Sequence, residues 1–260
     1  MLRFRHFISE NRKELQAIQT AYGKHSLPPI KKPEEDEFSQ EIEVHQGKHS
    51  LPPVHKPSPG KLTEEKDPPS PKHADMVKHY AGLRTHADKR YVQDYTQSSW
   101  KLNKNLHKAK GKVPKMHAEH VAHLDSALHH FKTPKAMTVH SAVHTDVSKL
   151  KKGKDGHIAV RHHGYMSTSI NHNISESFGK VFYHGKDRDP DFKEVKHVLK
   201  IHVPKGHPGA YVDHVSHNSG EKEFILPRGS KLKIHPKPVV KRLYAGSSEH
   251  TYTWHAKVVK

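Results

Sequence analysis

The chain has 260 residues, of which 32% are apolar and none is cysteine, and its mean hydropathy is −0.91. These values exclude disulfides and cysteine nucleophiles, and they favour one compact domain with polar flanks. Lys and Arg outnumber Asp and Glu by 45 to 27, for a formal net charge of +18, which favours contact with polyanions. No stretch approaches the roughly 20 apolar residues of a membrane-spanning helix, and the N-terminus lacks the apolar centre of a secretory signal.

The first 72 residues are expected to lie outside the compact domain. Residues 1–20 place apolar side chains at helical spacing among Arg and Lys, which predicts a short amphipathic helix that docks on a partner or on the main domain. Residues 21–72 contain ten of the eighteen prolines and repeat GKHSLPPIKKP (23–33) as GKHSLPPVHKP (47–57). This composition predicts a mostly disordered linker; the alternative is a duplicated docking motif in polyproline II form.

From residue 73 the pattern is that of a folded domain. Apolar residues at helical spacing predict amphipathic helices over 73–109 and 117–131. Beyond residue 136, short alternating or β-branched runs bounded by Gly, Pro, Asn and Asp predict strands at 136–143, 164–170, 196–203, 209–215, 222–227, 230–235, 238–244 and 251–259. Helices followed by strands predict an α+β domain over 73–260, with the N-terminal helices packed on a mainly antiparallel sheet.

Three motifs in this domain belong together. They are the first strand AMTVHSAV (136–143), the triplet STS at 167–169, and EKE at 221–223 running into FILPRG. In that order and context they resemble the ADP-ribosyltransferase exoenzyme family, in its branch with STS and ExE motifs. The resemblance covers about 75–245 and includes the helical segment YTQSSWKLNKNL (95–106). It implies the family's split-sheet fold, NAD as a substrate without any metal, and mono-ADP-ribosylation of a protein side chain, with arginine favoured by ExE.

The resemblance also assigns catalytic roles. Glu223 matches the family's catalytic glutamate, and a carboxylate there stabilises the positive charge that develops on the nicotinamide ribose. Glu221 matches the glutamate that engages the acceptor guanidinium, which a carboxylate can pair in bidentate fashion. Both glutamates are expected to reach one cleft, since residues two apart on a strand share a face. Ser167 matches the serine that orients the catalytic glutamate near the ribose.

The NAD-binding end departs from the family pattern. Members usually carry Arg on the first strand to hold an NAD phosphate, whereas this chain has His140 or Ser141 there, depending on the alignment. Arg161, or Arg84 and Lys104 on the helices, are other candidates for the phosphate contact. Phe178 is expected to stack on nicotinamide or to belong to a helix core. Thr168 and Ser169 are grouped with the cofactor-binding residues and are expected to shape the turn and the sheet hydrogen bonds.

The N-terminal MLRFRHFISE resembles the targeting peptides of internal head proteins of tailed bacteriophages. Ile8-Ser9-Glu10 and Leu62-Thr63-Glu64 resemble sites cut by phage prohead proteases. These resemblances predict a protein held in the phage head through its N-terminus beside packaged DNA, then released into the host cytoplasm. A host protein such as RNA polymerase or a translation factor would be the acceptor.

Two rival functions compete with the enzyme. The first is a non-catalytic basic nucleic-acid-binding or head-packaging protein, which the net charge favours although no recognition motif is present. The second is a zinc hydrolase built on His117, His120 and His123, which have helical spacing. HExxH is absent from the sequence, and we therefore expect no metal site.

Overall fold

The computed structural model describes residues 40–42, 68–184, 193–243 and 247–259, all within one compact unit that spans residues 37–260. The amphipathic helix predicted at 1–20 and most of the linker predicted at 21–72 lie outside the described residues. No helix in the described part of the chain has the length and apolar character needed to cross a bilayer.

The N-terminal part of the domain is a set of short helices. They are α2 (His73–His79), α3 (Lys89–Gln97), α4 (Trp100–Lys108) and α5 (Ala118–His130), with single 3-10 turns at Ala81–Arg84 and Lys115–His117. Each of the four α-helices buries apolar side chains in the core, for example Leu102 and Leu106 of α4. Gly111, at φ 80°, closes the end of helix α4 by donating its N–H to the Leu106 carbonyl, as a left-handed helix cap does.

Most of the other described residues form one continuous sheet of eleven strands. These are β1 (Gln40–Glu41), β2 (Met137–Val143), β3 (Ile158–His162), β4 (Met166–Ser169), β5 (Val181–His184), β6 (Lys193–Val203), β7 (Ala210–Tyr211), β8 (Glu223–Leu226), β9 (Ser230–Ile234), β10 (Val239–Arg242) and β11 (Glu249–Val259). Their order is β1-β3-β9-β11-β6-β2-β4-β8-β7, with β10 beside β11 and β5 beside β6. The sheet is mixed, since β1 runs parallel to β3 and β11 parallel to β6, and the other pairings are antiparallel.

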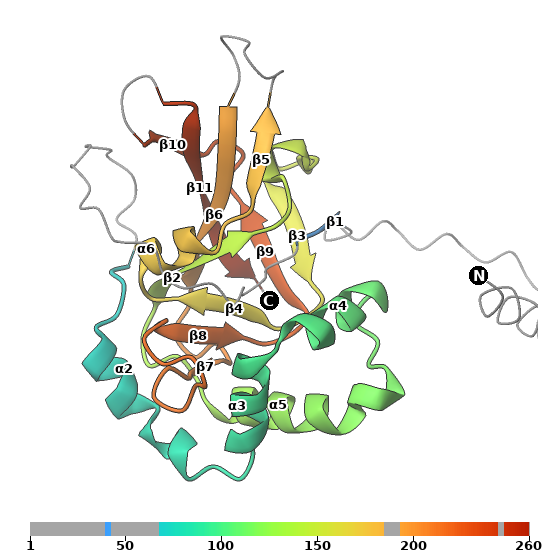
Figure 1. The fold of residues 1–260 in the computed structure, drawn as a ribbon, viewed down its shortest axis with the longest axis vertical. Coiled ribbons are helices and arrows are strands. Elements are labelled where there is room, and N and C mark those ends of the chain that lie inside the picture. Colours follow the sequence, from blue (N-terminus) through green and yellow to red (C-terminus); the bar gives the residue numbers. More distant parts are fainter. Residues whose placement is uncertain (1–39, 43–67, 185–192, 244–246, 260) are drawn as a thin grey trace, which may run out of the picture. The chain divides into compact units, whose positions relative to one another are not determined.

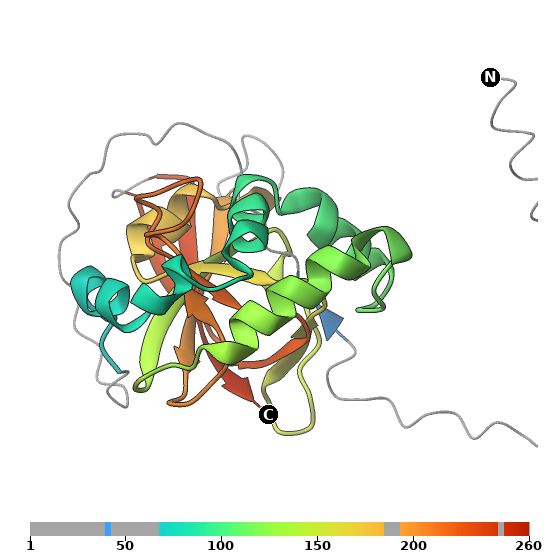
Figure 2. The same ribbon diagram turned by 90° about the horizontal axis from the view of Figure 1, so that it is seen from below.

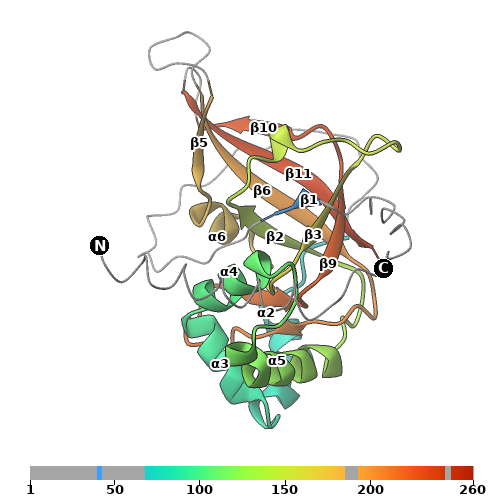
Figure 3. The same cartoon turned by 90° about the vertical axis from the view of Figure 1, so that its right-hand side faces the viewer.

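The sheet is weakly joined between β2 and β4. Seven residue pairs connect β2 to β6, and four connect β4 to β8, but β2 and β4 share only the pair His140–Ser169. This single pair divides the sheet into a large half ending at β2 and a small half made of β4, β8 and β7. Helices α2 to α5 gather at the small half (Figures 1 and 3), and α5 runs beside α3 and α4 when seen from below (Figure 2).

Four elements differ from the sequence-based expectation. Residues 40–42 fall in the predicted linker, yet they form β1 against β3, and Ile42 is buried in the core. The reason is that an apolar side chain and an edge strand with free hydrogen-bonding groups are enough to order three residues locally. Strands β3 and β5 were not expected, and neither was the short helix α6 (His172–Ser177) as a separate element.

Candidate active site

The register of three strands places the motif residues in one row. Glu223 on β8 lies opposite Ser169 on β4, and Ser169 lies opposite His140 on β2. Directly opposed residues of antiparallel strands project to the same face, so all three side chains share a face. Ser167, two residues before Ser169, shares it too. All four side chains are buried, Glu223 completely so, and the row crosses the junction between the two halves of the sheet.

Helices α3 and α4 cover this row with polar groups. The Tyr95 hydroxyl lies 3.1 Å from Ser167 Oγ and donates to the Tyr165 carbonyl. Asn103 Nδ2 donates to the Tyr95 hydroxyl at 3.1 Å and to the Tyr165 carbonyl at 3.0 Å, while Asn103 Oδ1 accepts from Tyr165 N–H at 2.9 Å. Burial first, and the nearby charge of Glu223 second, raise the pKa of Tyr95. The phenol therefore stays protonated beside Ser167 and Glu223.

The segment between β3 and β4 must approach α4 closely for these contacts to form. A Cβ at Gly164 would lie 2.4 Å from Asn103 Oδ1, so only glycine fits there. Tyr95 and Asn103 were not selected as site residues from the sequence. The signal is present in the helical segment YTQSSWKLNKNL (95–106). Its Tyr95 reaches Ser167 of the STS motif, and its Asn103 reaches Tyr165 just before that strand.

The structure distinguishes the two candidates for the missing first-strand Arg. His140 shares the face of Glu223 and Ser167, whereas the adjacent Ser141 projects to the opposite face by strand alternation. Ser141 Oγ donates to the Ser167 carbonyl at 2.8 Å, a contact between two strands of the sheet. The geometry therefore gives His140, and not Ser141, the position from which a side chain reaches the row.

Basic side chains continue the row beyond His140. Lys200 on β6 lies directly opposite His140 and therefore on the same face. The His172 ring, at the start of α6, has its centroid 5.1 Å from that of His140 in an edge-to-face arrangement. Burial is the main cause that lowers the pKa of His172, and the charges of Lys241 and Lys200 lower it further. Three basic side chains thus lie together at the end of the row away from Glu223.

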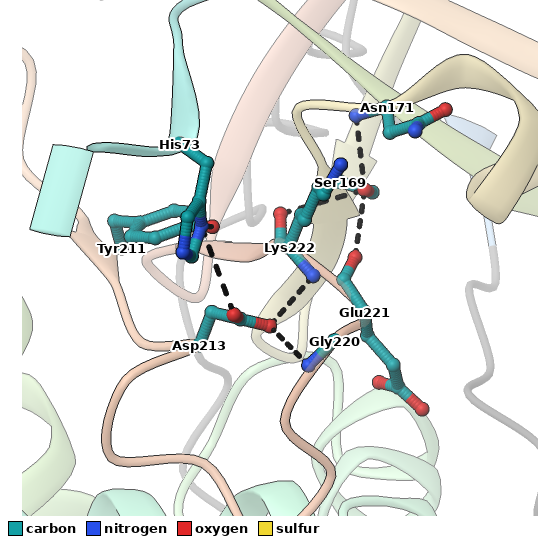
Figure 4. A network of polar contacts seen from close by, with 8 residues as sticks. All are labelled: His73, Ser169, Asn171, Tyr211, Asp213, Gly220, Glu221 and Lys222. Carbon is teal, nitrogen blue, oxygen red and sulfur yellow. Dashed lines mark hydrogen bonds and ion pairs between the residues drawn. The ribbon is translucent and has the colours of Figure 1, made fainter. Parts of the chain in front are cut away.

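Glu221 does not lie on the strand, contrary to the sequence-based expectation. Strand β8 begins at Glu223, and Lys222 has φ 51° in the left-handed region, which breaks the two-residue alternation. Instead, a turn carries Glu221 (Figure 4). Its carbonyl accepts from Ser169 Oγ at 2.8 Å, which ties the first glutamate of ExE to the last serine of STS. The two motifs are thus joined by a backbone contact and not by a shared strand face.

The Glu221 carboxyl group has an unusual environment. Its Oε2 atom is buried and has no hydrogen-bond partner among the described residues. Burial first, and the negative charge of Asp213 second, raise the pKa of Glu221 to about 7. A half-buried carboxyl with one oxygen that has no donor among the described residues is well placed to receive one from a substrate.

Three other predicted site residues lie away from this row. Thr168 faces the opposite side of β4, and its hydroxyl donates to the Phe224 carbonyl at 2.6 Å. Phe178 follows α6, is half-buried, and its carbonyl lies 3.2 Å from His144 Nε2. Arg161 is on β3, which β9, β11 and β6 separate from β2 in the sheet order. Their contact with NAD stays a prediction.

One cluster of side chains has the composition of a metal site. His184 Nε2 and His197 Nε2 lie 3.0 and 3.2 Å from the two oxygens of Asp146. However, the Trp254 indole donates to His197 Nδ1 at 2.9 Å, which leaves the ring proton on Nε2, where a metal would bind. Lys149 Nζ also lies 3.2 Å from Asp146. This donor set does not fit a cation, and the Asp146 carboxylate is held instead by hydrogen bonds with His184 and Ser148.

The histidines of the proposed zinc hydrolase do not converge either. His117 Nε2 lies 2.8 Å from Asn105 Nδ2, His120 Nε2 lies 3.1 Å from the Tyr91 carbonyl, and His123 Nδ1 lies 2.6 Å from an Asp88 oxygen. Each ring has its own protein partner on a different residue.

Comparison with known proteins identifies the family and the fold of this chain. The chain matches the family model described as ADP-ribosyltransferase exoenzyme over residues 60–259. No curated protein sequence matches it. Its fold is similar to that of Plx2a, an ADP-ribosyltransferase toxin from Paenibacillus larvae, at 18% identity and TM-score 0.55, over 72% of this chain and 94% of that one.

Two further solved structures show the same fold. The C3 exoenzyme of Clostridium limosum has 17% identity and TM-score 0.52, over 72% of this chain and 92% of that one. C3stau2 from S. aureus, solved with NAD, has 21% identity and TM-score 0.50, over 76% and 100% of the two chains. The match to the family model decides between the enzyme and the non-catalytic alternative, and it confirms an NAD-dependent mono-ADP-ribosyltransferase. The chain belongs to the ADP-ribosyltransferase exoenzyme family.

Proposed function

We propose that this enzyme transfers ADP-ribose from NAD to an arginine side chain of a host protein. The observation that carries the proposal is the arrangement of two carboxylates. Glu223 is buried in a row with Ser169 and His140, and Glu221, on the adjoining turn, has a buried oxygen with no donor from the described residues. Glu223 suits the ribose at which the bond breaks, and Glu221 suits the side chain that accepts the ADP-ribose.

In the transfer, the bond between the ribose anomeric carbon and the nicotinamide nitrogen breaks. A new bond forms from that carbon to a guanidine nitrogen of the acceptor, nicotinamide leaves, and the acceptor nitrogen releases one proton. Glu223 stabilises the positive charge that develops on the ribose as the first bond breaks. Tyr95 and Ser167, 3.1 Å apart, supply hydroxyl groups that orient the ribose and Glu223.

Glu221 is proposed to receive the acceptor. A guanidinium is planar and always charged, and it can donate two parallel N–H bonds to a carboxylate. It would supply the partner that Glu221 Oε2 lacks within the described chain. A neutral amide can donate a hydrogen bond to this oxygen but does not neutralise the charge. The ExE pattern and the buried carboxylate therefore both favour arginine over asparagine or glutamine.

His140 and Lys200 are proposed to take the place of the first-strand Arg. They lie opposite each other on β2 and β6, on the face of Glu223. Strands are about 4.8 Å apart, so His140 lies about 10 Å and Lys200 about 14 Å from the Glu223 backbone across the sheet. The NAD diphosphate lies several ångströms from the reacting carbon, and cations in this part of the row fit its charge. In this proposal Lys200 and His172 add to the contact that His140 makes.

The decisive experiment is a comparison of glutamate variants with labelled NAD and host lysate. Glu223→Gln is expected to abolish both ADP-ribose transfer and NAD hydrolysis, because it removes the charge and keeps the volume. Glu221→Ser is expected to lose transfer to arginine while sparing hydrolysis. Glu249→Gln, at an exposed position on β11, is the matched control and should behave as wild type. Transfer that survives Glu223→Gln in a folded protein would refute the catalytic assignment.

We also propose that the protein is packed in a phage head and injected into the host. The N-terminal targeting resemblance and the two protease-like sites support this proposal, and both lie outside the described residues. Cleavage after Glu64 would leave residues 65–260, whose first described contact is the bond from Thr138 Oγ1 to the Pro68 carbonyl at 2.6 Å. Mass spectrometry of purified virions tests the proposal. Absence of the protein from particles, or an intact N-terminus in mature heads, would contradict it.

A further inference from the structure

The turn that carries Glu221 is built around one buried side chain. This turn joins β7 to β8, and Asp213 lies near its start. Asp213 Oδ1 accepts from the N–H of Gly220 at 2.9 Å and from the N–H of Lys222 at 2.7 Å. These are the residues immediately before and after Glu221, so one carboxylate oxygen holds the backbone on both sides of the acceptor glutamate (Figure 4).

The backbone at these positions needs such support. Gly220 has φ 99° and Lys222 has φ 51°, and a left-handed conformation is unfavourable for a side-chain-bearing residue such as Lys222. From the other side, Ser169 Oγ donates to the Glu221 carbonyl at 2.8 Å, and Ile170 N–H donates to the Lys222 carbonyl at 3.1 Å. The Glu221 backbone is therefore clamped between Asp213 and the end of the STS strand.

The middle of the same turn is anchored to helix α3. Thr96 Oγ1 accepts from His217 N–H at 3.0 Å, and the Thr96 carbonyl accepts from Asn218 Nδ2 at 2.9 Å. The position of Asp213 is thus linked to a rigid element and not only to the turn itself.

Asp213 also acts on Glu221 through its charge. The side chain of Asp213 is buried, and it is the charged group whose field adds to burial in raising the pKa of Glu221. His73, at the start of α2, lies 3.8 Å from the other Asp213 oxygen, and its Nδ1 also lies 2.6 Å from the Tyr211 hydroxyl. Lys222 follows Glu221 in the chain, and Figure 4 shows the Glu221 carboxylate directed away from His73 and Tyr211.

We propose that Asp213 is the positioning residue of the acceptor subsite: it fixes the turn that presents Glu221 and places a second negative charge beside it, so that the subsite selects a cationic guanidinium. The proposal rests on the proposed role of Glu221. Two carboxylates of like charge repel each other, and a cationic acceptor relieves that repulsion whereas a neutral amide does not. The subsite therefore discriminates by charge as well as by hydrogen-bond geometry.

Two variants of Asp213 separate its two roles. Asp213→Asn keeps an oxygen that accepts from Gly220 and Lys222 but removes the charge. Asp213→Ala removes both. The control is Asp155→Asn, at an exposed carboxylate that pairs with Lys233 on β9. Each protein is assayed for NAD hydrolysis and for transfer to agmatine, a small guanidine acceptor, from pH 5.5 to 8.5.

In wild type, transfer should rise with pH as Glu221 ionises, around pH 7. Asp213→Asn should move this midpoint down by about one pH unit, because a like charge has been removed, and should raise the KM for agmatine about tenfold while leaving NAD hydrolysis unchanged. Asp213→Ala should lose transfer more than tenfold, again with hydrolysis retained. A midpoint and an agmatine KM that stay at the wild-type values in Asp213→Asn would overturn the electrostatic role. Equal loss of transfer and hydrolysis in Asp213→Ala would overturn the positioning role.

A second readout does not depend on transfer. The titration of the Glu221 carboxyl, followed by carbon NMR and assigned with Glu221→Gln, should show a lower midpoint in Asp213→Asn than in wild type. If wild type transfers to no guanidine acceptor but this titration shifts, the proposed function fails while the coupling of Asp213 to Glu221 stands. An unshifted titration would refute the coupling even in an active enzyme.

Discussion

Replacing Glu221 by Gln should make the protein more stable at alkaline pH, although it removes a site residue. Burial and the charge of Asp213 raise the pKa of this carboxyl from 4.5 to about 7. The folded state therefore holds the proton more tightly than the unfolded state. The stability that this proton contributes is complete below pH 4.5 and is lost as the pH rises through about 7. Above that pH the folded protein carries a poorly solvated charge.

The size of the effect follows from the shift. Each pKa unit corresponds to about 1.4 kcal/mol, which sets an upper limit of about 3 kcal/mol for Glu221. The carboxyl is partly exposed, so solvent screening reduces the expected value to about 1–2 kcal/mol. Gln keeps the shape of the side chain and cannot ionise. The difference in unfolding free energy between Glu221→Gln and wild type should thus grow by about 1–2 kcal/mol between pH 5 and pH 8.

Urea denaturation of both proteins at pH 5 and pH 8 measures this difference. Comparing the two proteins at each pH cancels the titration of the many histidines, which they share. Glu249→Gln, at an exposed position, serves as the control and should follow wild type at both pH values. A Glu221→Gln variant whose stability runs parallel to wild type across this range would show that Glu221 is not poorly solvated in the folded state.

Three further predictions concern the NAD-binding end of the row, the helix that covers the row, and the ion pair between Arg228 and Asp125. Lys200→Met should raise the Kd for NAD about tenfold, as loss of one charge-assisted contact does, and leave the Kd for nicotinamide riboside unchanged; equal effects on both would contradict a diphosphate contact. Tyr95→Phe should lower kcat while reducing stability by about 1–2 kcal/mol, since it removes the hydroxyl 3.1 Å from Ser167; an unchanged kcat would remove Tyr95 from the site. Arg228→Met should cost about 1–3 kcal/mol in urea denaturation, because it removes the charged partner of Asp125, now 2.8 Å from Arg228 Nη2, and leaves the carboxylate with the hydroxyl of Tyr165; adding Asp125→Asn should recover part of the loss, and no recovery would refute a specific pair.

Much of the fold can be read from the sequence because its signals are local. The alternation of apolar and polar residues predicts eight strands that the structure contains, including β2, β4, β6 and β8. Strands β3 and β5 were missed because their runs are short and rich in His, Arg or Tyr. The helical segment expected at 73–109 is divided between His79 and Lys89, and again at Ser98 and Ser99, where Ser98 leaves the helical conformation.

The sequence likewise identifies some residues of the candidate site and leaves others open. The STS and ExE motifs, and with them Ser167 and Glu223, are recognisable from residue type, order and spacing. The choice between His140 and Ser141 is not, because a shift of one residue in the alignment reverses which side chain faces the row. Only the pairing of β2 with β4 places His140 on the side of Glu223.

The sequence by itself determined the family and the use of NAD, and it singled out Glu223 as the proposed catalytic carboxylate, because these depend on short motifs whose residues are neighbours in the chain. Only the tertiary structure decided what surrounds them. Asp213 holds the turn of Glu221 through two N–H groups, and Asn103 brings Tyr95 to Ser167 from a separate helix. Lys200 meets His140 across two strands that are far apart in sequence. These contacts join residues 7 to about 70 positions apart, and no local pattern specifies which of many polar side chains will meet once the sheet and the helices have packed.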